Sequence, residues 1–111
     1  MKYEQPAPLS HSDAQAHAES ESATVVANAL VAVSLFEPDR VWAEEFVLRH
    51  LQDAREDVAG AAATSLGNLA RRFRYLSPES IESVRRAADD PRIAGRAEDA
   101  LDDINSFVGQ V

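Results

Sequence analysis

The chain has 111 residues, of which 45% are hydrophobic, no cysteine and a formal net charge of -8 at pH 7. The length fits one domain, and the lack of cysteine excludes disulfides and thiolate metal sites. The negative charge disfavours nucleic acid or an anionic membrane as partner and favours a basic protein. No apolar run resembles a signal peptide or a membrane span, so we expect a cytoplasmic protein with no membrane partner.

Residues 1–11 are polar and interrupted by Pro6 and Pro8. This pattern predicts a flexible tail in front of one helical domain over residues 12–111. The first predicted helix runs from about Ser12 to Leu35. Its apolar anchors follow helical spacing and are Val25, Ala29, Val33 and Phe36.

Four more helices are predicted from start and stop signals. Glu37-Pro38-Asp39 ends the first helix and starts a second one, which runs to about Leu51. A third helix covers about Asp57 to Arg72, Ser77-Pro78-Glu79 starts a fourth, and Asp90-Pro91 starts a fifth. No segment shows the alternating pattern of a strand, so the fold class is predicted to be all-α.

Residues 58–69 recur 35 residues later as residues 93–104. The matched pairs are Val58/Ile93, Ala59/Ala94, Gly60/Gly95, Ala62/Ala97, Leu66/Leu101 and Leu69/Ile104. Such a period with helical apolar spacing is typical of an α-solenoid, in which neighbouring helix pairs stack. The first predicted helix fits the same frame at a shift of 33 residues. We therefore predict a short right-handed solenoid of about five helices, a leading helix followed by two helix pairs.

The stretch from Asp57 to Leu69 resembles a HEAT repeat, whose second helix opens with Asp followed by Val-Arg-x-x-Ala-x-x-x-Leu-Gly-x-Leu. The matching residues are Val58, Ala62, Leu66, Gly67 and Leu69, and Asp90-Pro91-Arg92-Ile93 is similar to the family's Asp-Pro-x-Val entry. The likeness covers about residues 39–108 and implies a HEAT-like solenoid without implying a particular function. Ala59 and Ala94 replace the family's Arg, which implies weaker hydrogen bonding between the pairs.

Four carboxylates cluster on the fifth predicted helix. They are Glu98, Asp99, Asp102 and Asp103. Like charges repel on a helix and lower its stability, so the cluster indicates a functional role for these residues. At the 35-residue shift the third helix presents small residues, which are Ala63, Thr64, Gly67 and Asn68. We predict that Thr64, Asn68 and the four acids form a flat track beside an acidic ridge, where a basic partner binds. An ordinary solvated face explains the cluster equally well, and the acids converge too poorly for a metal site.

Other candidate chemistry is weaker. Arg71, Arg72 and Arg74 alternate with Phe73 and Tyr75, a pattern that can contact nucleic acid, although positive charge also suits a helix C-terminus. The histidines, His11, His17 and His50, lack metal-binding spacing. No phosphate loop or nucleophile elbow is present. We predict no enzyme, no cofactor, no metal and no small-molecule substrate.

The acidity, small size and short solenoid together favour a binding protein. The hypothesis is a bacterial immunity protein or antitoxin that covers a basic, nuclease-type toxin encoded nearby, with electrostatic steering of the encounter. One alternative is a HEAT-like scaffold or regulatory adaptor, and another is a nucleic-acid-binding helical repeat protein. A HEAT-like enzyme such as a lyase is a third.

Overall fold

The computed structural model describes residues 6–109 and folds them into six α-helices. These are α1 (His11–Ala18), α2 (Ala23–Phe36), α3 (Arg40–Leu48), α4 (Glu56–Phe73), α5 (Pro78–Ala87) and α6 (Ala94–Phe107). The all-α prediction is confirmed for the described residues. The predicted number of about five helices is wrong. No helix in residues 6–109 has the length and apolar character needed to cross a membrane.

The error lies in the first predicted helix, which is broken into α1 and α2. The Ser20 hydroxyl accepts the N–H of Ser22, and the Ser22 hydroxyl caps α2 by accepting the N–H of Val25. Serine hydroxyls compete with the helix for backbone N–H groups in this way. The predicted tail lies partly outside the described residues. Residues 6–10 are not helical, and His11 already begins α1.

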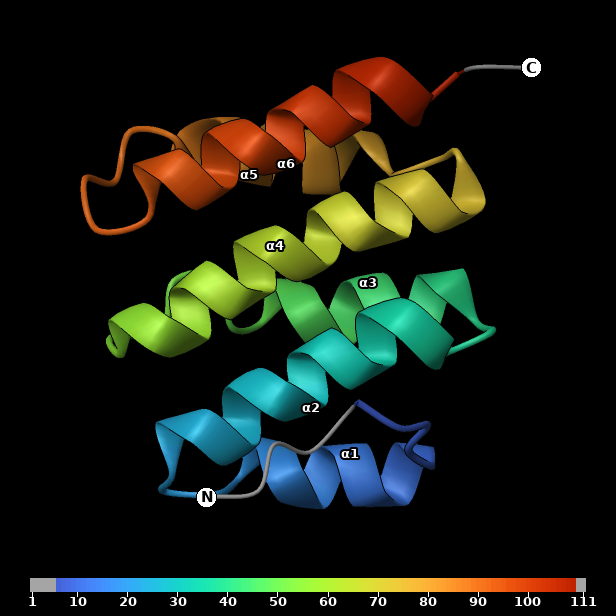
Figure 1. Cartoon of the computed structure of the whole chain (residues 1–111), viewed down its shortest axis with the longest axis vertical. Coiled ribbons are helices and arrows are strands. Elements are labelled where there is room, and N and C mark those ends of the chain that lie inside the picture. Colours follow the sequence, from blue (N-terminus) through green and yellow to red (C-terminus); the bar gives the residue numbers. More distant parts are fainter. Residues whose placement is uncertain (1–5, 110–111) are drawn as a thin grey trace.

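The helices form three consecutive pairs (Figure 1). The second members, α2, α4 and α6, lie side by side in one front layer, while α3 and α5 lie behind it and α1 lies beside α2. Ser34 of α2 meets Asn68 of α4, so these two helices are in direct contact. The residues that the sequence predicted to bind a partner lie on α4 and α6 of this layer.

Helices α4 and α6 run parallel, as the internal repeat predicted. Gly60 lies under the Arg96 side chain, and seven residues further along, Gly67 faces Ala100 and Asp103. A Cβ at Gly67 would lie 3.2 Å from the Ala100 Cα. This close approach needs a residue without a side chain, which explains the glycine. The repeat segments 58–69 and 93–104 are therefore neighbouring, parallel helix segments.

Helix α4 is the centre of the core, because it contacts α2, α3, α5 and α6. Its apolar stripe is fully buried at Val58, Ala62, Leu66 and Leu69. This stripe is the one that the sequence predicted for the third helix.

A buried carboxylate joins α3 to the start of α5. Glu44 is 3% exposed, and its Oε1 accepts hydrogen bonds from the Ser77 hydroxyl at 2.8 Å and from the Ser77 N–H at 3.1 Å. The Ser80 hydroxyl donates to the same oxygen, and Arg40 pairs with Oε2. Ser77 also caps α5, as its sequence signal predicted. Asp90-Pro91 instead forms a turn, and α6 begins later, at Ala94.

Candidate protein-binding surface

The two predicted site residues on α4 differ in exposure. Thr64 is exposed on the outer side of the front layer. Asn68 is 8% exposed, its Nδ2 donates to the Ser34 Oγ at 3.0 Å, and its Oδ1 accepts from Arg71. Asn68 therefore holds α2 against α4 and presents little surface to a partner.

The predicted flat track of small residues on α4 is largely covered. Ala63 is fully buried, and Gly60 and Gly67 lie beneath the α6 side chains Arg96 and Asp103. The small residues allow α6 to approach. Of the four positions named for this track, only Thr64 remains at the surface.

The four carboxylates of α6 point in different directions. Asp103 faces α4, where its Oδ2 lies 3.7 Å from the Arg71 Nε. Because successive residues turn by about 100°, Glu98 and Asp102 point away from α4, and Asp99 points outward from the front layer. These three side chains are exposed and form no ion pair within residues 6–109.

The repeat suggests an ordinary role for two of these acids. At the 35-residue shift, Glu98 and Asp102 correspond to Ala63 and Gly67, which are covered by α6. Glu98 and Asp102 thus occupy the side of α6 where a further helix would pack. Charge at this position disfavours the packing of a further helix against α6. The front-facing carboxylate that remains beside Thr64 is Asp99.

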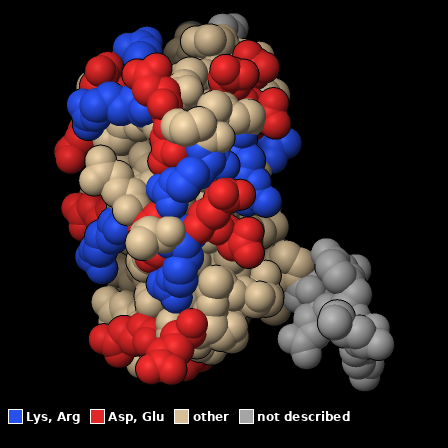
Figure 2. Space-filling model, turned by 90° about the vertical axis from the view of Figure 1, so that its left-hand side faces the viewer, with Lys and Arg blue, Asp and Glu red and all other residues tan. Residues whose placement is uncertain are grey.

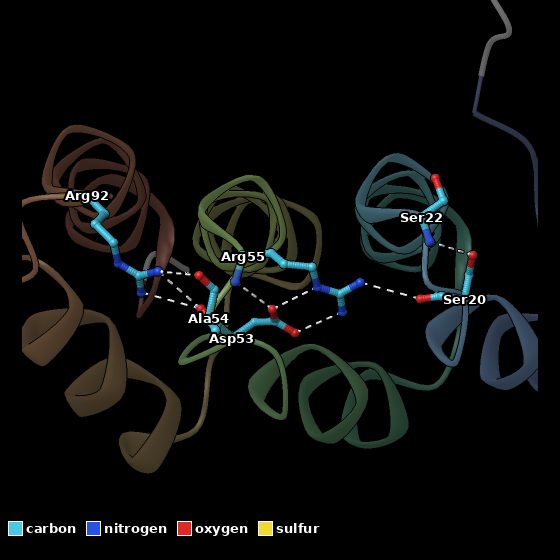
Figure 3. Close-up of polar contacts among 6 residues, drawn as sticks. All are labelled: Ser20, Ser22, Asp53, Ala54, Arg55 and Arg92. Carbon is cyan, nitrogen blue, oxygen red and sulfur yellow. Dashed lines mark hydrogen bonds and ion pairs between the residues drawn. The ribbon is translucent and has the colours of Figure 1, made fainter.

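Two Asp-x-Arg turns, which the sequence reasoning missed, precede α4 and α6. Figure 3 draws the first of them, Asp53 to Arg55, together with Arg92 of the second. Asp53 Oδ1 accepts the Arg55 N–H at 2.8 Å and the Arg55 Nε at 3.0 Å. Asp90 Oδ1 accepts the Arg92 N–H at 2.9 Å, and Arg92 Nη2 donates to Asp90 Oδ2 at 2.9 Å. The side-chain hydrogen bond from its arginine lowers the pKa of each aspartate. The same bonds raise the pKa of Arg55 and of Arg92.

Each arginine also reaches back to the preceding helix pair. Arg92 Nη1 donates to the Ala54 carbonyl at 3.0 Å, and Arg55 Nη1 donates to the Ser20 carbonyl at 3.4 Å (Figure 3). Hydrogen bonds between the pairs are thus present although Ala59 and Ala94 stand where the HEAT family has Arg. The bonds come from arginines in the turns, and the recurrence of Asp-x-Arg after 37 residues was a sequence signal for them. Basic side chains cross the middle of this end of the molecule, with acidic groups on both sides (Figure 2).

The two aromatic residues of the nucleic-acid alternative, Phe73 and Tyr75, each have an arginine over the ring. The guanidinium of Arg72 lies 4.5 Å from the centre of the Phe73 ring, and that of Arg40 lies 4.5 Å from the Tyr75 ring centre. Ring faces covered in this way are less available for stacking on bases. Within residues 6–109, no group of three or more His, Cys, Asp or Glu side chains could hold a metal ion.

Comparison with known proteins gives an informative similarity to a solved structure. No family model matches the sequence, and no curated protein matches it. A chain in the crystal structure of a CDI complex from Cupriavidus taiwanensis LMG 19424 is 27% identical, with a TM-score of 0.85. The match covers 96% of this chain and 97% of that chain. The all-α arrangement is therefore similar over nearly the whole length to a component of a CDI complex.

Proposed function

We propose that this chain is the immunity protein of a contact-dependent inhibition pair, which binds a basic, nuclease-type toxin in the bacterial cytoplasm and neutralises it. The observation that carries the proposal is the whole-length similarity to a chain of a CDI complex, with a TM-score of 0.85. A match over 97% of that chain supports an equivalent role for the whole molecule rather than for a shared fragment.

The net charge indicates that this chain corresponds to the immunity protein of such a pair and not to the toxin. A protein that acts on nucleic acid needs a cationic surface, and this chain has a net charge of -8. An acidic protein can cover such a surface in competition with nucleic acid, and its field speeds the encounter. The basic partner is therefore proposed to be a nuclease.

Growth provides the direct test. The toxin domain encoded next to this chain is expressed in a bacterial host with and without the chain. We expect growth arrest with the toxin alone, normal growth with both, and co-purification of the two proteins. Arrest that persists when both are present would contradict the proposal, and the absence of a toxin-like neighbouring gene would favour the adaptor alternative.

The α6 carboxylates can be tested separately. If they attract the toxin, Glu98→Lys with Asp102→Lys weakens binding at least about tenfold, because it reverses two exposed charges. The control, Glu79→Lys with Glu82→Lys, makes the same change in net charge on the exposed surface of α5. Equal losses of affinity in the two double variants would show that toxin binding depends on the net charge of the chain and not on the position of the α6 carboxylates. Undiminished binding by the α6 variant would remove these two acids from the interface.

We also propose that the three helix pairs form a short HEAT-like, right-handed solenoid. The parallel packing of α4 and α6 and the bonds between successive Asp-x-Arg turns support this assignment. In a crystal structure, the same right-handed rotation should superimpose the first helix pair on the second and the second pair on the third. A left-handed or inconsistent rotation would refute the assignment.

A further inference from the structure

Helix α2 has an unusual surface for an exposed helix. Its 14 residues, Ala23–Phe36, include no charged side chain. Nevertheless Leu35 is 37% exposed on the outer side of the helix, and Val25 and Phe36 are 37% and 41% exposed about 100° further round it. A surface helix of a monomeric protein normally carries charged residues on its solvent side. Exposed apolar surface without charge is typical of an interaction site.

The outer residues of α2 form one row, which we call the α2 row. It consists of Thr24, Asn28, Val31 and Leu35. Their spacing of four, three and four places them on one side of the helix, opposite the buried residues Val26 and Leu30. Ser34, next to Leu35, bonds to Asn68 of α4, so the row lies directly beside α4.

The front layer therefore changes in character from one edge to the other. The α2 row is uncharged. In the middle, α4 presents the small polar Thr64 and Arg71, which is paired with Asp103. Helix α6 presents the unpaired carboxylate Asp99, with Asp102 toward its outer edge.

We propose that the cationic toxin docks across α2, α4 and α6, with an apolar contact on the α2 row and its basic side chains against the α6 carboxylates. The inference rests on the proposed function and specifies the surface that performs it. Charge complementarity selects the occupant, since a cationic partner is attracted to the α6 carboxylates and α2 itself carries no charged side chain. The neighbouring cations of α4 are engaged within the layer, Arg71 with Asp103 and Arg72 with the Ser34 carbonyl. The two regions have different roles, because exposed charges mainly set the association rate and desolvated apolar contacts mainly set the dissociation rate.

Matched substitutions test this surface in the complex of the full chain with the toxin domain. Asn28→Arg places a cation in the α2 row, and Leu35→Ala removes an apolar contact. Gln52→Arg and Val41→Ala make the same kinds of change at exposed residues outside the front layer. We expect at least a tenfold loss of affinity for Asn28→Arg and a several-fold faster dissociation for Leu35→Ala. Both control variants should bind like the unmodified chain, and circular dichroism checks that all four fold.

Crosslinking gives a second readout that does not depend on affinity. A photoreactive amino acid at position 28 or 64 should crosslink to the toxin domain, and one at position 45 or 82, on α3 or α5, should not. Crosslinks from 45 and 82 alone, or equal binding by all four variants, would overturn the inference while leaving the immunity function intact. If the unmodified chain forms no complex, the proposed function itself fails, and the docking surface fails with it.

Discussion

At the scale of single residues, the least expected feature is the buried carboxylate of Glu44. One oxygen serves three donors at the start of α5, and the other pairs with Arg40. The cap at Ser77 was predictable, because Ser-Pro-Glu is a local signal. Its bond to Glu44 was not predictable, because the two residues are 33 positions apart and only the packing of α3 against α5 brings them together.

The variant Glu44→Gln should be strongly destabilising. The amide would present a donor or a weaker acceptor to the three donors, and it would leave Arg40 without its counter-charge. We expect a loss of about 2 kcal/mol or more in the free energy of unfolding, measured by urea titration. The neighbouring exposed residue provides the control, because Glu45→Gln should change stability by less than about 0.5 kcal/mol. Equal effects of the two variants would show that the buried network is not important for stability.

Acid should destabilise the protein through the Asp-x-Arg turns. The hydrogen bonds from Arg55 and Arg92 lower the pKa of Asp53 and of Asp90 below the ordinary value of 3.8. A carboxylate whose pKa is lower in the folded state stabilises the fold above its unfolded pKa, and this contribution is lost as the pH falls through the folded value. We therefore expect unfolding free energy to fall below about pH 4, and to fall less in the variant Asp53→Asn with Asp90→Asn.

Urea unfolding at pH 7 and at pH 3 checks this expectation. Asp99→Asn serves as the control, because Asp99 is exposed and forms no ion pair within the described residues. If the double variant loses as much unfolding free energy between pH 7 and pH 3 as the unmodified protein, Asp53 and Asp90 are not the cause of the acid sensitivity.

At the scale of helices, sequence reasoning succeeded where the signals are local and periodic. The predicted third helix, Asp57 to Arg72, differs from α4 by one residue at each end. The first predicted helix failed because the polar segment Glu19-Ser20-Glu21-Ser22 was included in one helix, although serine in front of the apolar run from Ala23 is a helix-start signal. The hydroxyls of Ser20 and Ser22 bond to backbone N–H groups there and separate α1 from α2. The sequence correctly predicted that the third and fifth predicted helices, α4 and α6, are neighbours. It could not show that Asn68 is buried and bonded to Ser34, because that contact depends on the packing of α2 against α4.

The packing of α4 against α6 makes two glycines respond oppositely to alanine. At Gly67 a methyl group would lie 3.2 Å from the Ala100 Cα, so α6 must move, and we expect a net loss of about 1–2 kcal/mol. At Gly95 nothing lies within 4 Å, so alanine should stabilise the helix by up to about 1 kcal/mol. Thermal unfolding of both variants checks the signs. A stabilising Gly67→Ala would show that the two helices do not pack this closely.

At the scale of the whole molecule, the net charge of -8 should control the rate of toxin binding. Salt shortens the range of attraction from about 10 Å at 0.1 M to about 3 Å at 1 M. Association measured by stopped flow should therefore slow at least about tenfold between 0.05 and 0.5 M NaCl, with a nearly constant dissociation rate. Asp99→Asn with Asp102→Asn should reduce this salt dependence more than Glu79→Gln with Glu82→Gln. An association rate that is insensitive to salt would exclude electrostatic steering.

The Asp-x-Arg turns also bear on how such a chain can arise. Each arginine finds its carboxylate two residues earlier, in its own turn, and contributes only bonds to carbonyl oxygens of its neighbour. A duplicated gene segment would therefore bring its own counter-ion, and any preceding turn could supply the carbonyl acceptors. Lengthening by tandem duplication would leave no guanidinium unneutralised, which makes these turns suitable junctions for recombination.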